Sequence, residues 1–158
     1  CGGLQMLGEA LIDPHGIDGN APGLGLLPLV TVFDEDKTVR HTQAQFGRVS
    51  GLWAALSGVH VQGYEIHHGQ TAQHPAMAAA GNVAQVVLPN GLGWKNTPGN
   101  VLGCYLHGLF EDPAVLHALF GAAAPTLDSV FDGLADFIEA HFEPGVLRAL
   151  AHGHPHAQ

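Results

Sequence analysis

The chain has 158 residues, the length of one domain with a proper hydrophobic core. Five Lys and Arg against fourteen Asp and Glu give a net charge of −9, so no face is basic enough to bind a phosphate backbone, and nucleic acid is excluded as a partner. Only 12% of the residues are charged while 46% are hydrophobic, a balance that predicts a folded domain and excludes a disordered acidic tail.

The first segment after the N-terminal cysteine has helical periodicity. Leu4, Leu7 and Leu11 recur at helical spacing behind a pair of glycines, and Asp13 and Pro14 follow them. The sequence therefore predicts a short opening helix that ends before Pro14.

Five candidate strands follow a loop rich in Pro and Gly at residues 14–25. Residues 26–33 and 38–45 are two β-like runs, and the acidic turn at residues 34–36 between them predicts a hairpin. Three further strands are predicted at residues 59–67, 83–88 and 101–106.

Helices return near the C-terminus. Asp112 and Pro113 supply an N-cap and a first-turn proline, and an amphipathic pattern with an acidic first turn predicts a helix at residues 127–141. Residues 146–150 add one more helical turn. The His-rich residues 151–158 are expected to form a disordered tail, which leaves residues 1–150 as the folded domain.

The two cysteines, Cys1 and Cys104, are too few for a disulfide framework, and their separation gives no metal-ligand spacing. No apolar run reaches the ~18 residues that span a bilayer, and no signal peptide is recognisable. We therefore expect a cytoplasmic protein without a membrane segment or a metal site. Because the chain begins at a cysteine and lacks an initiator methionine, we also expect it to be a fragment of a longer polypeptide.

Cys1 is the first candidate for chemistry. It precedes two glycines that open a helix, as in a nucleophile elbow, where the helix start favours a thiolate and offers N–H groups to an oxyanion. A buried cysteine at a helix start, beside glycines needed for packing, explains the spacing equally well.

His107 is the second candidate. It follows a predicted strand and precedes Gly108, a position from which a loop can direct an imidazole as a general base. Cys104 differs from it in strand parity, so we expect Cys104 to be a small core residue. A lone histidine at a strand end is usually structural, and the catalytic interpretation of His107 depends on Cys1.

The densest ordered polar cluster spans residues 63–69. Strand alternation places Glu65 and His67 on one face and Tyr64 and His68 on the other, so one of the two histidines is expected to face a cleft. A zinc site is not favoured, because the segment supplies no cysteine ligands.

Four motifs, in order along the chain, carry a family resemblance: residues 1–8, 23–28, 63–71 and 103–110. Together they resemble the C-terminal glutamine amidotransferase domain of cobyric acid synthases, the cobalamin-pathway branch of the class I, or triad, amidotransferases. The resemblance implies an α/β fold of the class I glutamine amidotransferase-like (flavodoxin-like), three-layer type, present here as a fragment that starts at the nucleophile elbow.

The resemblance also implies roles. Cys1 would attack the side-chain amide of L-glutamine and form a γ-glutamyl thioester with release of ammonia, and His107 would accept and return the proton. The N–H of Gly2 would supply half of the oxyanion hole, and Gln5 would help to hold the substrate. The residues expected near the substrate on the third motif are Tyr64, Glu65 and His67.

The third member of the triad departs from the family pattern. Many class I enzymes have a glutamate two residues after the histidine, whereas this chain has Leu109 there. Asp112 is better explained as a helix N-cap, which leaves Glu111 and Glu65 as candidates. A Cys–His dyad is also sufficient in principle, because the base deprotonates the thiol.

The resemblance places further parts upstream of residue 1: the strand that leads into the elbow, the second oxyanion donor and an ATP-dependent synthetase domain. That domain would use ATP and Mg²⁺ to amidate a corrinoid acceptor, adenosylcobyrinic acid a,c-diamide, while this chain itself needs no cofactor. An incomplete sheet exposes an edge strand, which would favour a homo-oligomer.

Two other functions stay open. In an N-terminal nucleophile hydrolase, the α-amine of Cys1 would be the base. This hypothesis predicts that the chain opens as a strand, and it leaves His107 without a role. In the other hypothesis the chain is a non-catalytic assembly module.

Overall fold

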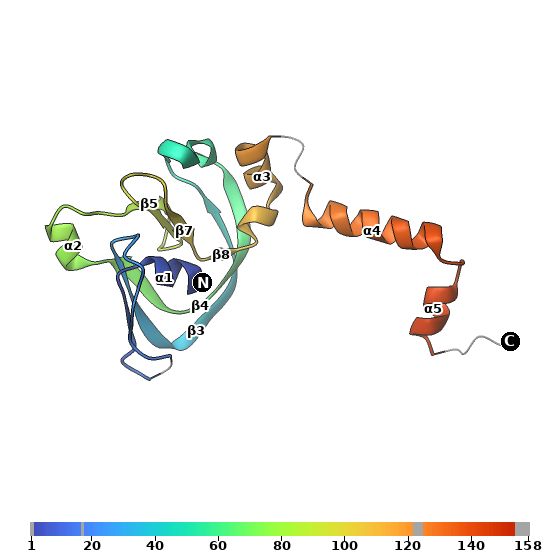
Figure 1. Ribbon diagram of the computed structural model, residues 1–158, viewed down its shortest axis with the longest axis horizontal. Helices are drawn as coiled ribbons and strands as arrows, with labels where there is room; N and C mark the ends of the chain where they lie inside the picture. The colour runs from blue at the N-terminus through green and yellow to red at the C-terminus, as the bar shows by residue number, and fades with distance from the viewer. Residues whose placement is uncertain (1, 17, 122–124, 154–158) are drawn as a thin grey trace. The chain divides into compact units, whose positions relative to one another are not determined.

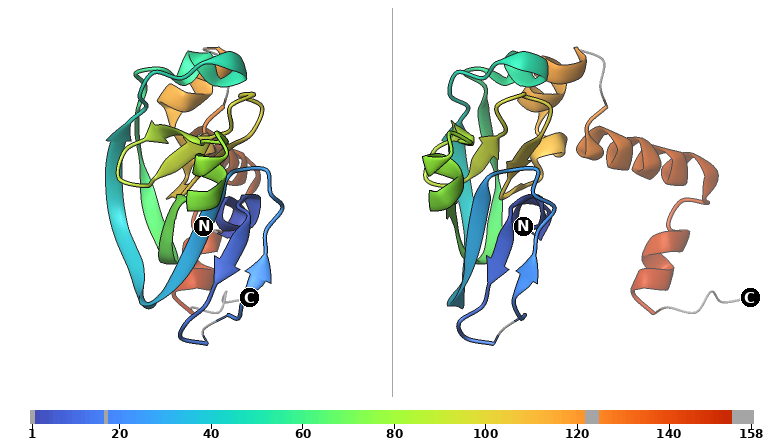
Figure 2. Two further views of the ribbon diagram at one scale, coloured as in Figure 1. Left: turned by 90° about the vertical axis from the view of Figure 1, so that its left-hand side faces the viewer. Right: turned by 60° about the vertical axis from the view of Figure 1, so that its left-hand side comes forward.

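The computed structural model describes residues 2–16, 18–121 and 125–153, and the chain divides into two compact units, residues 1–123 and 124–158. The first unit has a five-stranded sheet in the order β2-β1-β3-β4-β8 and a three-stranded sheet in the order β5-β6-β7 (Figures 1 and 2). Helices accompany both sheets, so the predicted mixed α/β class is confirmed.

The helices of the first unit are α1 (Gly2–Leu7), α2 (Pro75–Ala79) and α3 (Pro113–Phe120), with 3₁₀ turns η1 (Gly51–Leu56) and η2 (Leu109–Glu111). The strands are β1 (Ala10–Ile12), β2 (Ala21–Pro22), β3 (Leu29–Gln45), β4 (His60–Gln73), β5 (Gln85–Leu88), β6 (Gly93–Lys95), β7 (Leu102–Cys104) and β8 (Leu106–His107).

The opening helix is confirmed but is shorter than predicted. α1 ends at Leu7, and Leu11 lies in β1, which pairs in parallel with β3. Gly8 makes the turn possible, because a Cβ there would lie only 2.8 Å from the carbonyl oxygen of Leu29. Pairing with β3 therefore overrides the helical spacing of Leu11.

The predicted hairpin at residues 34–36 is wrong. β3 runs continuously and pairs antiparallel with β4, from Leu29 opposite Gln73 to Gln45 opposite His60. The acidic residues form an irregularity between Val32 and Lys37 and do not reverse the chain. Because β4 offers partners on both sides of this bulge, the two β-like runs join into one strand.

The strand predicted at residues 101–106 is divided in the structure. β7 pairs with β6 in the small sheet, and β8 pairs with β4 in the large one. Tyr105 lies between them, is only 2% exposed and donates its N–H to the carbonyl of Leu92 at 2.8 Å. Cys104 and His107 therefore lie in different strands, and alternation along a single strand does not decide which faces their side chains take.

The core of the first unit lies between the sheets and α1, η1 and α3. α1 packs against β7 at Gly103, where an added Cβ would lie 2.7 Å from Leu4 Cδ1, so glycine allows this close approach. The Asp112 carboxylate accepts the N–H of Ala114 at 2.8 Å, which confirms the predicted N-cap of α3. The cap also accepts the N–H of Gln62 at 3.2 Å and so ties α3 to β4.

The second unit contains α4 (Leu127–His141) and α5 (Val146–Ala151), close to the predicted boundaries. The Thr126 side chain caps α4 by accepting the N–H of Ser129 at 3.2 Å. None of the residues of α4, all of which are described, is buried, and its apolar stripe is exposed. Ala151 still belongs to α5, while residues 154–158 of the predicted tail lie outside the described residues.

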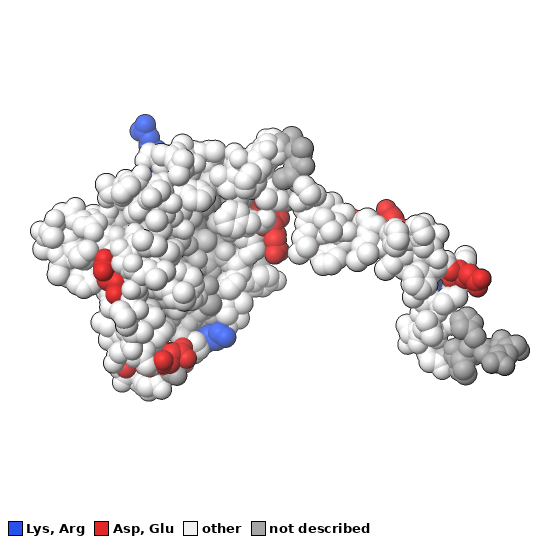
Figure 3. Space-filling model, viewed as in Figure 1, with Lys and Arg blue, Asp and Glu red and all other residues white. Residues whose placement is uncertain are grey.

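Among the described residues, no helix is both long and apolar enough to cross a membrane. Charged side chains are sparse on the face shown in Figure 3, in agreement with their small share of the sequence.

Candidate active site

His107 lies at the end of a strand, as predicted: it is the last residue of β8, and it is exposed. Gly108 follows with a left-handed φ of 84°, which turns the chain sharply into η2. The carbonyl of Gly108 accepts the N–H of Glu111 at 2.9 Å and holds this turn closed. The backbone that carries the His107 imidazole is therefore fixed by this turn.

A cavity of about 620 Å³ lies beside this corner. Gly3 and Leu4, in the first turn of α1, line one wall, and Leu106, Gly108 and Glu111 line another. The residues that follow the candidate nucleophile and those that flank the candidate base thus border the same hollow. Cys1 itself lies outside the described residues. Gly2, the predicted oxyanion donor, is exposed at the start of α1.

The chain opens as a helix from Gly2 onward. An N-terminal nucleophile hydrolase was expected to open as a strand, so this feature does not fit that alternative.

Cys104 also lines the cavity, but its thiol is packed against the core and contacts the carbonyl oxygen of Leu106 at 3.8 Å. Burial raises the pKa of this thiol, which the Leu106 hydrogen bond only partly offsets. A thiol in this state is a poor nucleophile at neutral pH, as expected for a core cysteine.

Gln5 is nearly buried, with 8% of its surface exposed. Its Nε2 donates to the carbonyl oxygen of His68 at 2.8 Å, so the side chain ties α1 to β4. Gln5, which was predicted to help to hold the substrate, thus makes an internal structural contact.

The predicted alternation along β4 is confirmed. Glu65 and His67 point to the buried face, with 4% and 5% exposure, whereas Tyr64 is 57% exposed. Tyr64 packs edge-on against the His41 ring, with centroids 5.2 Å apart. The three residues predicted near the substrate thus divide between two faces of the sheet.

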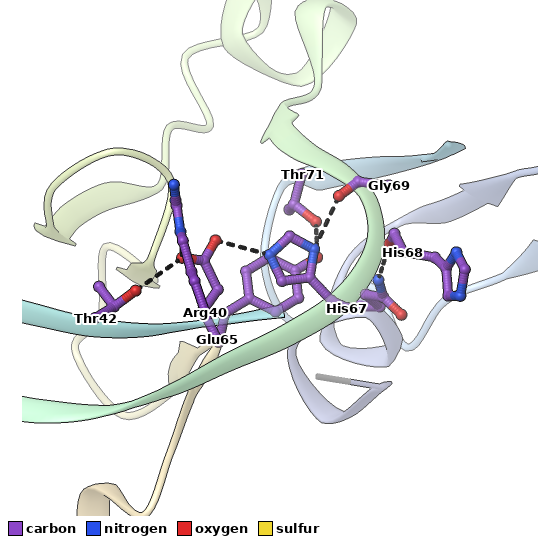
Figure 4. Close-up of polar contacts among 9 residues, drawn as sticks. Arg40, Thr42, Glu65, His67, His68, Gly69 and Thr71 are labelled. Carbon is purple, nitrogen blue, oxygen red and sulfur yellow. Dashed lines mark hydrogen bonds and ion pairs between the residues drawn. The ribbon is translucent and has the colours of Figure 1, made fainter. Parts of the chain in front are cut away.

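Glu65 is a buried carboxylate between the buried His67 and the exposed Arg40 (Figure 4). One carboxylate oxygen accepts from Nε of Arg40 at 2.6 Å, and the other pairs with Nε2 of His67 at 2.9 Å. Burial alone raises the pKa of this carboxyl, but the hydrogen bonds and charges of Arg40 and His67 together outweigh burial and lower it below its usual value. Glu65 is therefore held as a carboxylate.

His67 is held at both ring nitrogens. Nδ1 lies 2.9 Å from the carbonyl oxygen of Gly69, and Nε2 faces the Glu65 carboxylate. Both ring nitrogens therefore have a polar partner inside the fold. The ring stacks on Tyr105 with centroids 3.8 Å apart, and the Tyr105 hydroxyl bonds to Oγ1 of Thr71.

Strand register separates the two candidates for the third triad member. Tyr64 pairs with His107 and Glu65 with Leu106, and directly paired residues share a face in an antiparallel sheet. Glu65 therefore lies on the face opposite His107. Glu111 lies in the turn that follows His107 and borders the cavity.

Sequence reasoning missed Arg40 and Tyr105 as parts of this region. Arg40 lies opposite Glu65 only because β3 and β4 pair along their whole length, a register that the predicted hairpin concealed. Tyr105 and Thr71 stand inside the quoted motifs, so motif membership was the available signal. The described residues contain no group of three or more His, Cys, Asp and Glu side chains that could hold a metal ion.

Comparison with known proteins agrees with this arrangement. The family model of the CobB/CobQ-like glutamine amidotransferase domain matches residues 1–115, and the chain belongs to this family. It is similar to the cobyric acid synthases of a Polaromonas species (77% identical over 150 residues), Variovorax paradoxus (73% over 150) and Leptothrix cholodnii (60% over 157). Each match covers 95% of this chain and 30%, 31% and 30% of the respective relative. The chain thus corresponds to the glutamine amidotransferase part of such a synthase and spans about a third of the relatives' length.

Proposed function

We propose that the chain hydrolyses L-glutamine and supplies the ammonia for an ATP-dependent amidation of a corrinoid, as the name of its relatives suggests. The observation that carries this proposal is that one cavity is bordered both by the first turn of α1, which follows Cys1 in the chain, and by the two neighbours of His107. Membership of the CobB/CobQ-like amidotransferase family supports the same chemistry.

In the proposed reaction, the Cys1 thiolate attacks the side-chain carbonyl carbon of glutamine. The N–H of Gly2 donates to the oxygen on which charge develops. The C–N bond then breaks, the leaving nitrogen takes a proton from the His107 imidazolium, and ammonia departs from a γ-glutamyl thioester. Water next loses a proton to His107 and attacks the thioester carbon. The C–S bond breaks and releases glutamate, whose carboxyl proton passes to the solvent, and the Cys1 thiolate and the His107 imidazolium are regenerated.

The other predicted residues have separable roles in this proposal. Tyr64 shares its face with His107 and is exposed, which supports a direct contact with substrate. Gln5, Glu65 and His67 use their polar atoms inside the fold, which supports a role in shaping the site. The position of Glu111 supports it as the orienting acid of His107.

The corrinoid acceptor, adenosylcobyrinic acid a,c-diamide, and the ATP and Mg²⁺ that activate its carboxylates would bind to the part of the relatives that this chain does not match. Such a synthase would work in the cytoplasm.

The proposal is tested with a chimera in which this chain replaces the matching segment of the Polaromonas cobyric acid synthase. A diazo-ketone glutamine analogue is expected to alkylate Cys1. Cys1→Ser is expected to abolish glutamine-dependent amidation and to spare amidation with free ammonia. Labelling of Cys104, or full glutamine-dependent activity in Cys1→Ser, would contradict the proposal.

A further inference from the structure

Tyr105 contacts both α1, which follows Cys1, and β8, which ends at His107. It is the residue between β7 and β8, two positions before His107, and it is 2% exposed. Its backbone N–H donates to the carbonyl oxygen of Leu92 at 2.8 Å, which fixes the backbone directly before β8.

The hydroxyl group of Tyr105 contacts side chains of β4 and α1. It bonds to Oγ1 of Thr71 on β4 and also interacts with the side chain of Gln5 in α1. Gln5 is the fourth residue after Cys1, and its Nε2 donates to the carbonyl oxygen of His68. A chain of polar contacts therefore links the helix behind the candidate nucleophile to the strand that ends at the candidate base.

The ring of Tyr105 packs against His67, whose own position is fixed by hydrogen bonds. His67 stacks on it with an interplanar angle of 19°. Because both nitrogens of His67 are bonded, to Glu65 and to Gly69, the imidazole has no free rotation, and Arg40 anchors the Glu65 carboxylate from outside.

We propose that Tyr105 is a positioning residue, which holds α1 and β8 at a fixed separation so that Cys1 and His107 meet in the same geometry in each turnover. It acts through Gln5 on one side and through the backbone of β8 on the other. This inference rests on the proposed function for its catalytic consequence, whereas the link between α1 and β8 is a property of the fold alone.

The test compares Tyr105→Phe with Ser57→Ala in the full chimera. Tyr105→Phe keeps the ring and its stacking on His67 but removes the hydroxyl. Ser57→Ala is a matched control, because it removes a hydroxyl with two hydrogen bonds to the backbone of Val49, at 2.9 and 3.0 Å, in a loop apart from α1. Both variants leave a polar partner without its bond and lose stability to a similar extent.

Two measurements are made on each variant. Amide hydrogen exchange of residues 4–7 is expected to accelerate about tenfold in Tyr105→Phe, the factor that one lost hydrogen bond accounts for, and to stay unchanged in Ser57→Ala. For glutamine hydrolysis, kcat is expected to fall about tenfold in Tyr105→Phe with KM within about twofold, since the reacting groups are displaced and the substrate contacts are not.

A second variant, Gln5→Met, breaks the same link from the side of α1. If the two residues act together, the double variant Tyr105→Phe with Gln5→Met falls no further in kcat than the lower of the two single variants. The inference would be overturned if the kcat losses of the two single variants multiplied in the double variant. It would also be overturned if amide exchange of residues 4–7 were unchanged in both single variants.

The exchange measurement keeps this inference separate from the proposed function. A chimera without glutaminase activity but with faster α1 exchange in Tyr105→Phe would refute the proposed function and retain the link. An active chimera with unchanged exchange and kcat in Tyr105→Phe would refute the positioning role and retain the function.

Discussion

Tyr64 of β4 and His107 of β8 lie directly opposite each other in antiparallel register. Directly opposed residues on one face have neighbouring Cβ atoms, and both side chains are exposed. β4 therefore presents the ring of Tyr64 beside the candidate base on β8, and this relationship motivates the first prediction.

Tyr64→Ala is expected to raise KM for glutamine about fivefold and to change kcat little, because a contact with the bound substrate is lost while the reacting groups remain. Steady-state kinetics of the chimera measures both constants. Tyr64→Phe, which keeps the ring, is the control and is expected to retain the wild-type KM. A fall in kcat with unchanged KM would show that Tyr64 acts on the chemical step.

Cys104 is expected to resist iodoacetamide at pH 8. Burial raises the pKa of its thiol, so the reactive thiolate is scarce and shielded. Timed alkylation of Cys1→Ser, followed by peptide mass spectrometry, isolates the reactivity of Cys104. A denatured sample provides the fully reactive reference, and labelling of the folded chain at the denatured rate would contradict this prediction.

Acid sensitivity is expected to depend on Glu65. The pKa of its carboxyl is lower in the folded chain than in the unfolded one, so the unfolded state binds more protons. The stability gained from Glu65 is thus present above the unfolded-state pKa and is lost as the pH falls through the folded-state value.

Urea unfolding of the wild type, Glu65→Gln and Asp36→Asn between pH 7 and pH 3 measures this effect. Glu65→Gln is expected to be less stable at pH 7 and to lose less stability on acidification than the wild type. Asp36→Asn alters an exposed carboxylate in the bulge of β3 and is expected to follow the wild-type curve. Parallel curves for the wild type and Glu65→Gln would refute the role of Glu65.

Two glycines are expected to respond in opposite directions to alanine. A Cβ at Gly103 would lie 2.7 Å from Leu4 and 3.0 Å from Leu7, so Gly103→Ala is expected to cost about 1–3 kcal/mol by overpacking. Gly133 in α4 has no atom within 4 Å of such a Cβ, so Gly133→Ala is expected to stabilise α4 by about 0.5–1 kcal/mol. Chemical denaturation for Gly103→Ala, and the helical circular dichroism signal on heating for Gly133→Ala, measure the two effects. A Gly103→Ala variant as stable as the wild type would show that α1 does not pack on β7 as described.

Several local features were predictable from the sequence because they depend on neighbouring residues. Asp112 before Pro113 carries its own N-cap, and the amphipathic spacing of residues 127–141 defines α4. The strict alternation along β4 placed Glu65 and His67 together on one face. His107 before Gly108 marked a strand end on the same local grounds.

Other features depend on segments that are far apart in the chain. Helical spacing extended α1 to Leu11, yet the parallel partner β3 takes that residue into a strand. The acidic residues 34–36 have the composition of a turn, and only the length of β4 makes β3 continuous past them. Tyr105 had no distinctive periodicity, because its place is defined by two different sheets.

The sequence by itself determined the helix caps, the face of each β4 side chain and the motifs that identify the family, since these follow from spacing along the backbone. Only the tertiary structure decided that Arg40 neutralises Glu65 and that Tyr105 joins α1 to β8. These contacts arise from strand register and packing between distant segments, and periodicity within one segment carries no information about which other segment will lie beside it.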